Sequence, residues 1–557
     1  MAIKGTQILL DTLVEEGVDV MFGYPGGSVL PLFDALYDSP LRFVLTRHEQ
    51  GAAHMADGYA RATGKVGVCI ATSGPGATNL TTGIATANMD SIPMVAITGQ
   101  VKTHLIGNDA FQEADVTGIT RSISKHNYLV KDVQDLARIV KEAFHIARTG
   151  RPGPVVIDLP SDVTTADHEG EIDKEIHLPG YKPRTDGHSR QIRLAAEAIN
   201  GAERPVLYVG GGVILANASD ELRKLVETAN LPVTMTLLAL GTVPGDHTLS
   251  LGMLGMHGTA TANYAVTESD LLIAIGARFD DRVTGKLDAF APKAKIIHID
   301  IDPTSISKNI SVDIPVVGDA GKILKELVQH VRHNPRKEWL KKIADWKKKH
   351  PITYDANSGD LKPQAIIEEL CRITPDDAII TTEVGQNQMW TALWYTFRKP
   401  RTLLTSGGLG TMGYGFPAAL GAQVGFPDRL VVDIAGDGSI QMNIQELTTA
   451  VFHKLPVKII ILNNGYLGMV RQWQELFYHR RYSQTTLTGN PDFVKVAEAF
   501  GARGLRLEDP KDIRAKLEET LATDGPVVLD CRIAPEENVF PMVPAGQAIN
   551  RMIGGMA

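Results

Sequence analysis

Short apolar runs alternate with segments of helical spacing along almost the whole chain. Runs that fit buried parallel strands lie at residues 43–45, 66–70, 94–97, 155–157, 206–209, 271–275, 296–299, 379–380, 403–404, 430–434 and 457–462. Helical patterns such as 50–63 and 441–453 separate many of them. Parallel strands need crossover connections, which are usually helices. The pattern therefore predicts an α/β protein with doubly wound parallel sheets.

Two polar segments divide the chain into three blocks. Residues 164–190 and 350–363 are rich in proline, glycine and charged or amide side chains, which is typical of linkers. We expect domains at residues 1–165, 190–333 and 363–535, followed by a tail at 536–557. A chain of 557 residues is too long for one hydrophobic core, which also favours about three domains.

Composition narrows the class of protein. The chain is 43% apolar and 22% charged, as soluble globular proteins are. A net charge of −8 gives a nucleic-acid partner no electrostatic support. The basic run at 336–349 reads as a surface helix with Trp339, Ile343 and Trp346 on its apolar side. No secretion signal or membrane-spanning stretch is present in the sequence, so we expect a cytoplasmic enzyme without a membrane partner.

The three cysteines give no metal or disulfide pattern. Cys69, Cys371 and Cys531 are far apart in the sequence. Cys69 and Cys531 lie in apolar, strand-like runs. We therefore expect buried, unreactive thiols at these two positions.

The most informative local pattern is Gly436-Asp437-Gly438, which follows one apolar run, with Asn463-Asn464 after the next. Neighbouring parallel strands end on the same side of a sheet, so Asp437 and Asn464 should converge where open α/β sheets bind ligands. Carboxylate and amide oxygens suit Mg²⁺, and the glycines let backbone approach a diphosphate. By itself Asp437 could simply cap the next helix. The paired asparagines at this spacing favour the cofactor site.

Glu49 is a second candidate at a strand end. It follows the strand-like residues 42–46 and begins the helical run at 50–63. A carboxylate at a helix N-terminus is also stabilised by the helix dipole alone, so its position does not by itself indicate catalysis.

Together these segments resemble the thiamine diphosphate (ThDP) enzymes. Residues 47–61 resemble the segment that supplies the glutamate which protonates the cofactor's pyrimidine ring. The resemblance thus implies that Glu49 activates the cofactor for proton loss. It also implies Mg²⁺ ligation by Asp437, Asn464 and the Tyr466 backbone carbonyl, with the diphosphate near Gly436, Gly438 and Ser439.

Two further segments resemble ThDP-binding loops of that family. Residues 382–390 would contribute Val384, Gly385, Gln386 and Asn387, and residues 406–415 would contribute Gly410 and Met412. Met412 would wedge under the thiazolium ring, although a gap-filling core methionine is the alternative. Asn387 replaces a histidine that is usual in relatives, and its amide can still bond a phosphate.

Within the ThDP enzymes, the closest resemblance is to acetohydroxyacid synthase (acetolactate synthase) catalytic subunits. It rests on residues 23–28, 106–113 and 465–474 and extends over essentially the whole chain. It implies a catalytic role for Gln112 and substrate contacts for Phe111, Met469 and Trp473. Ordinary packing is the alternative for Trp473. An aromatic wall there would discriminate ethyl from methyl by only about 1–3 kcal/mol.

The middle block resembles the FAD-binding region of the biosynthetic synthases. The resemblance rests on residues 254–258 and 276–283, since catabolic relatives lack this arginine-rich signature. Arginines suit a diphosphate, and an aspartate at a strand end suits a ribose. No Gly-x-Gly-x-x-Gly pattern occurs in this block. The implied flavin-lining residues are Arg151, Thr236, Leu237, Met256, His257, Arg278, Arg282, Asp300, Ile301, Gly318 and Asp319.

The resemblance implies decarboxylation of pyruvate and ligation to a second pyruvate or to 2-oxobutyrate, at the start of branched-chain amino acid synthesis. It also implies a homodimer or homotetramer and a small regulatory subunit. One alternative is a pyruvate oxidase with ThDP and FAD. Glyoxylate carboligases lack the activating glutamate, so Glu49 argues against that activity. Another alternative is a non-catalytic nucleotide-binding homologue, against which Glu49, Asp437 and Asn464 argue.

Overall fold

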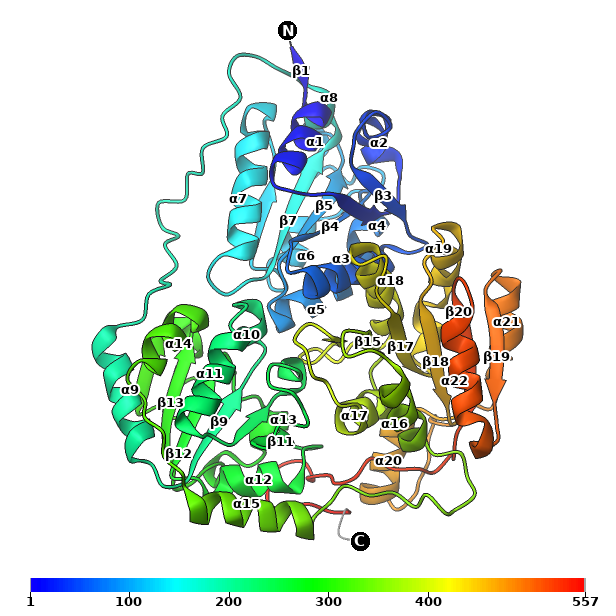
Figure 1. Cartoon of the computed structure of the whole chain (residues 1–557). Coiled ribbons are helices and arrows are strands. Elements are labelled where there is room, and N and C mark those ends of the chain that lie inside the picture. The colour runs from blue at the N-terminus through cyan, green and yellow to red at the C-terminus, as the bar shows by residue number, and fades with distance from the viewer. Residues whose placement is uncertain (1, 555–557) are drawn as a thin grey trace.

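A computed structural model describes residues 2–554 and contains, within them, three six-stranded parallel sheets (Figure 1). Each sheet is flanked by helices, so the predicted α/β class with three doubly wound sheets is confirmed. A small antiparallel pair joins β1 (Ile3–Lys4) to β8 (Asp167–His168).

The first sheet has the strand order β3-β2-β4-β5-β7-β6. Its strands are β2 (Val20–Gly23), β3 (Arg42–Leu45), β4 (Gly67–Ala71), β5 (Met94–Gln100), β6 (His126–Leu129) and β7 (Pro154–Pro160). Its helices are α1 (Gly5–Glu15), α2 (Leu30–Leu36), α3 (Glu49–Thr63), α4 (Pro75–Asn79), α5 (Thr81–Asp90), α6 (Val116–Thr120), α7 (Leu136–Arg148) and α8 (Ser161–Thr165). Four of these strands coincide with the predicted apolar runs. The two that were not predicted are four residues long.

The second sheet has the order β11-β10-β9-β12-β13-β14. Its strands are β9 (Pro205–Val209), β10 (Val233–Met235), β11 (Ser250–Met253), β12 (Leu271–Ile275), β13 (Lys295–Asp300) and β14 (Ile314–Val317). Its helices are α9 (Ser189–Gly201), α10 (Gly212–Leu215), α11 (Ser219–Ala229), α12 (Ala260–Glu268), α13 (Asp281–Thr284), α14 (Ala320–Val328) and α15 (Lys337–Lys349). In α15 the side chains of Trp339 and Ile343 are buried, as the pattern predicts.

The third sheet has the order β16-β15-β17-β18-β20-β19. Its strands are β15 (Ile379–Thr382), β16 (Leu403–Leu404), β17 (Val431–Gly436), β18 (Lys458–Asn463), β19 (Arg503–Leu507) and β20 (Val527–Arg532). Its helices are α16 (Pro363–Ile373), α17 (Gln386–Trp394), α18 (Gly415–Gly425), α19 (Leu447–Phe452), α20 (Gly468–Phe477), α21 (Phe493–Ala499) and α22 (Ile513–Ala522).

The helix predicted at 441–453 is wrong over its first half. Residues Ile440–Met442 and Ile444–Glu446 form short 3-10 turns, and α19 begins only at Leu447. Asn443 lies between the turns with its side-chain amide donating to the Gly413 carbonyl at 2.6 Å. This long-range contact holds Asn443 between the two turns, which accounts for the interruption.

The first and third units pack through α3 and α18, which lie side by side (Figure 1). Glycines allow the close approach. A Cβ at Gly58 would collide with the Ala418 carbonyl oxygen, and one at Gly421 would collide with that of Met55. One continuous core consequently includes Ala56 of α3 and Ala419 of α18.

Three extended segments run between the units, namely residues 169–188, residues 350–362 and the C-terminal tail after β20 (Figure 1). The predicted linker after α8 runs from the first sheet to α9. The red tail returns from β20 to the second unit, where Val543 N donates to the Met256 carbonyl at 2.8 Å and Ile549 joins the core beside α15.

The expectation of buried cysteines also has an outcome in the structure. Cys69 and Cys531 are buried as predicted, and burial raises the pKa of both thiols, that of Cys69 to about 12. No helix between residues 2 and 554 combines the length and apolarity needed to cross a membrane.

Candidate functional site

Asp437 and Asn464 come together because β17 and β18 are hydrogen-bonded neighbours. β17 ends at Gly436 and β18 at Asn463, so the next residue of each strand emerges at the same edge of the third sheet. Both side chains are buried. The convergence predicted from the sequence is therefore present.

The Asp437 carboxylate is held by neutral donors. Burial raises its pKa to about 6, whereas the Asn490 amide, at 2.6 Å, and the backbone N–H groups of Asn464 and Gly465 lower it. A buried carboxylate without a cationic side chain among these partners suits a metal cation, and Mg²⁺ needs only one or two carboxylates besides phosphate and water. Among residues 2–554 no three His, Cys, Asp or Glu side chains group as a metal site.

Glycines lie in the backbone next to this site. Gly385, at the start of α17, has φ 150°, and a Cβ at Gly436 would lie 3.4 Å from Asn387 Oδ1. Both donors of the Asn387 amide are occupied, because its Nδ2 donates to the Glu383 and Ile434 carbonyls at 3.0 and 2.8 Å. Asn387 thus ties the ends of β15 and β17 together and offers no free N–H to a phosphate in this conformation.

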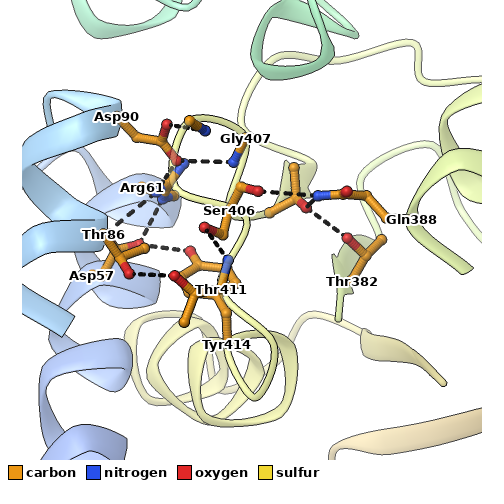
Figure 2. A network of polar contacts seen from close by, with 12 residues as sticks. Asp57, Arg61, Thr86, Asp90, Thr382, Gln388, Ser406, Gly407, Thr411 and Tyr414 are labelled. Carbon is orange, nitrogen blue, oxygen red and sulfur yellow. Dashed lines mark hydrogen bonds and ion pairs between the residues drawn. The ribbon is translucent and has the colours of Figure 1, made fainter. Parts of the chain in front are cut away.

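The loop at 406–416, which contains Gly410 and Met412, is anchored at both ends. Ser406 Oγ accepts a hydrogen bond from Thr411 N at 3.0 Å, and Thr411 Oγ1 meets Thr86 Oγ1 of α5 at 2.7 Å (Figure 2). Beyond Met412, the buried Glu383 carboxylate accepts from Gly413 N at 2.6 Å. The conformation around Met412 is therefore set by both the first and third units.

A buried ion network supports the same loop (Figure 2). Arg61 of α3 contacts Asp57 at 2.6 Å and Asp90 at 2.8 Å, and all three are buried. Asp90 in turn accepts hydrogen bonds from the Gly407 and Gly408 N–H groups, while Tyr414 donates to Asp57 at 2.6 Å. The pairing of Arg61 with two carboxylates compensates for the burial of these charges.

A cavity of about 1460 Å³ lies between the second and third units. It is large enough for an extended dinucleotide cofactor, since ordinary ligand pockets are about 300–1,000 Å³. Ten of the predicted cofactor-binding residues line it: Arg151, Thr236, Leu237, Met256, His257, Arg278, Arg282, Val384, Gly385 and Gly410. Met469 and Trp473 line it as well.

Two polar features of the cavity are available to a ligand. His257 is 8% exposed, and its Nδ1 has no hydrogen-bond partner within residues 2–554. Burial lowers the pKa of His257 to about 4, so this imidazole is neutral near pH 7. Arg282 lies over the Trp473 ring at 5.9 Å from its centroid and so joins the predicted flavin and substrate regions.

Four predicted flavin residues lie outside the cavity lining. Asp300 ends β13 and Ile301 follows it. Asp319 caps α14 by accepting from Lys322 N at 2.9 Å, and a Cβ at Gly318 would lie 2.9 Å from the Thr185 carbonyl. The contacts of Gly318 and Asp319 therefore shape β14, α14 and the linker.

Glu49 belongs to a separate surface on the first unit. Its carboxylate accepts from Asn79 Nδ2 at 2.9 Å and is half-buried at the start of α3. Gln112 lies nearby with φ 59°, its carbonyl 2.7 Å from where a Gly74 Cβ would be. Phe111 beside it is 88% exposed. No hydrogen bond or ion pair within residues 2–554 joins this surface to Asp437.

The comparisons with known proteins agree with this architecture. Residues 3–119, 192–327 and 383–531 match the N-terminal TPP binding domain, the central domain and the C-terminal TPP binding domain of thiamine pyrophosphate enzymes. The chain is 52% identical to "Acetolactate synthase" of Mycobacterium bovis, over 98% of this chain and 90% of that protein.

Two relatives from other organisms are similar to the chain to about the same degree. The "Probable acetolactate synthase large subunit" of Methanocaldococcus jannaschii is 51% identical over 99% of this chain and 95% of its own length. The "Acetolactate synthase isozyme 3 large subunit" of Escherichia coli is 48% identical over 99% of this chain and 98% of its own length.

The chain belongs to the acetolactate synthase large-subunit family. It is thus a member of the ThDP-dependent enzymes, as the motifs predict.

Sequence reasoning missed several groups that this acetolactate synthase family member places at the site. Asn79 holds Glu49, Asn490 holds Asp437, and Gln472 contacts Gln386. Each is an amide far along the chain from its partner. No local periodicity marks such contacts, although Gln472 lies inside the predicted segment 465–474.

Proposed function

We propose that this protein is an acetolactate synthase, which decarboxylates pyruvate and joins the remaining two-carbon unit to a second 2-oxo acid. The observation that carries the proposal is the pairing of Asp437 with Asn464 at the ends of β17 and β18, next to a cavity lined by Met469 and Trp473. The similarity to acetolactate synthases over 98–99% of the chain supports it.

ThDP supplies, when bound, an electron sink for the carbanion left by loss of CO₂. Asp437, Asn464 and the Tyr466 carbonyl would hold Mg²⁺. The diphosphate would lie beside small residues, namely Gly385, Gly410, Gly436, Gly438 and Ser439. The loop next to it would be shaped by Val384, Gln386 and Asn387. Met412 would support the cofactor from a loop anchored on both sides. Glu49 would hold a proton at the pyrimidine ring.

The separation of Glu49 from Asp437 supports a homodimer as the active unit, with a homotetramer as a larger assembly. Glu49, Gln112 and the exposed Phe111 form a surface on the first unit, whereas the Mg²⁺ ligands lie on the third. A second copy of the chain would bring one surface against the other, bury Phe111 and exclude water from the reacting carbons.

FAD is the second cofactor in this proposal. The cavity's arginines, Arg151, Arg278 and Arg282, fit a diphosphate, and the unpartnered His257 nitrogen fits a polar flavin atom. The flavin would be structural rather than a redox partner. Asp300, Ile301, Gly318 and Asp319 would lie at the outer end of the site.

The products place the enzyme at the first common step of branched-chain amino acid synthesis. Pyruvate as acceptor gives 2-acetolactate, and 2-oxobutyrate gives 2-aceto-2-hydroxybutyrate. The relatives named "large subunit" support a small regulatory subunit as partner.

The test is to incubate the purified protein with pyruvate, ThDP and Mg²⁺, with and without FAD, in air and anaerobically. Acetolactate that requires FAD but not oxygen is the expected result. Oxygen-dependent H₂O₂ as the main product would instead make the protein a pyruvate oxidase. Acetolactate without FAD dependence would contradict the flavin assignment alone. Absence of turnover and of ThDP binding would favour a non-catalytic homologue.

A further inference from the structure

Three buried amide side chains form a continuous hydrogen-bonded chain from the proposed metal site to the C-terminal tail. Asn464 Nδ2 donates to Gln386 Oε1 at 3.1 Å, and Gln386 Nε2 donates to Gln472 Oε1 at 3.0 Å. Gln472 then pairs with the backbone of Val539. The three amides are at most 8% exposed, so water competes little for these bonds.

The tail backbone determines which way the Gln472 amide faces. Val539 N donates to Gln472 Oε1 at 2.8 Å, and Gln472 Nε2 donates to the Val539 carbonyl at 2.9 Å. A backbone N–H can only donate and a carbonyl can only accept. If the Gln472 amide were rotated by half a turn, its NH₂ group would face the Val539 N–H and its oxygen would face the Val539 carbonyl oxygen, so both hydrogen bonds would be lost.

The orientation passes on to Gln386 and Asn464. Gln386 Nε2 is flanked by two acceptors, Gln472 Oε1 and the Glu537 carbonyl, both at 3.0 Å. Oε1 of Gln386 must therefore face Asn464. Because this oxygen can only accept a hydrogen bond, Asn464 turns its donor atom, Nδ2, toward Gln386. The Asn464 oxygen then lies on the other side, where it accepts from Tyr466 N at 3.1 Å.

We infer that Gln386 and Gln472 are positioning residues that hold the Asn464 amide with its oxygen directed to the metal. The inference rests on the proposed function, because it needs Mg²⁺ at Asp437 and Asn464. Gly468 supports it, since a Cβ there would collide with Gln386 Oε1 and lie 2.7 Å from Asn464 Nδ2. The start of α20 is thus packed directly against the amide pair.

The first experiment titrates Mg²⁺ into the full-length protein with saturating ThDP and follows ThDP binding by fluorescence. Gln386→Met and Gln472→Met keep side-chain length but remove the amides. Loss of a group that orients a metal ligand typically weakens metal affinity about 10–100-fold. We expect that range for Gln386→Met and a smaller loss for Gln472→Met.

Gln423→Met is the matched control. Gln423 is a buried glutamine of α18 whose Nε2 donates to the Phe426, Pro427 and Arg429 carbonyls, without contact to Asn464. Unchanged Mg²⁺ affinity in this variant, beside weakened affinity in the other two, supports the inference. Affinities of all three variants within twofold of wild type overturn it, as does an equal loss in Gln423→Met. A wild type that binds ThDP without Mg²⁺ would instead contradict the proposed metal site.

Hydrogen exchange provides a readout independent of activity. Coupling between two sites is reciprocal, so Mg²⁺ and ThDP should slow exchange at the Val539 amide if Gln472 and Gln386 connect it to Asn464. We expect at least fivefold slowing in wild type and none in Gln386→Met. Equal slowing in both proteins would overturn the inference.

Discussion

The Asp90 carboxylate accepts a hydrogen bond from Gly408 N at 2.7 Å, although the two residues are 318 positions apart. The contact joins the end of α5, in the first unit, to a loop of the third unit. This loop lines the large cavity. The shape of the proposed cofactor site therefore depends on a charge contributed by another unit.

Replacing Asp90 should destabilise the protein strongly. Asp90→Ala removes one partner of the buried Arg61 and the acceptor for Gly407 and Gly408 N–H. Breaking a buried pair in this way costs about 3–5 kcal/mol. Urea unfolding of wild type and variant measures the loss.

The exposed pair of Lys4 with Asp167 supplies the control for that experiment. These side chains are 56% and 50% exposed, and Asp167→Asn should change stability by less than about 1 kcal/mol. Equal effects of the two substitutions would show that the Asp90 network contributes no more than a surface pair.

Glu49→Gln should largely abolish acetolactate formation while ThDP remains bound. The amide keeps the shape of the side chain but cannot hold a transferable proton at the pyrimidine ring. General acid–base groups typically contribute 10²–10⁴-fold, so we expect about that loss in kcat. Glu15→Gln, at an exposed position of α1, is the comparison. Turnover of Glu49→Gln within tenfold of wild type would rule out the assigned role.

Glu446 should make stability depend on pH. Burial raises its pKa from 4.5 to about 7, against the lowering effects of Thr449 and the Arg47 and His48 N–H groups. Between these values the folded protein binds a proton that the unfolded chain releases, so stability falls as pH rises from about 4.5 to about 7. At 1.36 kcal/mol per pKa unit, the decrease is roughly 3 kcal/mol.

Glu446→Gln isolates this contribution, because glutamine does not ionise. The unfolding midpoints of wild type and variant should be compared at several pH values from 4 to 8. The stability of Glu446→Gln relative to wild type should increase as the pH rises to about 7 and should then stay constant. Parallel pH profiles would mean that the pKa of Glu446 is the same in the folded and the unfolded protein.

Gly421→Ala should separate α3 from α18. Its Cβ would collide with the Met55 carbonyl oxygen, which belongs to helix backbone and cannot rotate away. Overpacking of this kind typically costs about 1–3 kcal/mol. Gly201→Ala at the end of α9 is the control, since a Cβ there meets nothing within 4 Å. Thermal unfolding should distinguish them, and equal melting temperatures would contradict the close packing.

His257→Leu should weaken FAD binding about 2–10-fold, as expected for loss of one net hydrogen bond of about 0.5–1.5 kcal/mol. His247→Leu is the comparison, because His247 lies in the same unit, accepts a hydrogen bond from Leu249 N at 3.2 Å and does not line the cavity. Quenching of flavin fluorescence measures both affinities. An effect of His247→Leu as large as that of His257→Leu would indicate a general disturbance of the second unit.

The sequence predicted the parts of the fold that depend on local pattern. Apolar runs such as 271–275 were recognisable because parallel strands are buried on both faces. β10, with three residues, is too short to show a period, and the turns before α19 depend on Asn443 and its distant partner Gly413. The same distinction holds at the site. Asp437 and Asn464 could be predicted because each follows the end of a recognisable strand. The amide side chains that orient them come from elsewhere in the chain and could not be predicted.

The packing of α3 against α18 also constrains how the protein is made. Every residue of α3 from Gly51 to Ala62 is buried, yet part of that cover comes from α18, which is synthesised only after the second unit. At about 5–20 residues per second, a ribosome needs on the order of tens of seconds to bridge that interval. During translation the nascent first unit thus exposes this face of α3 until residue 425 has emerged, and transiently exposed apolar surface of this kind favours aggregation.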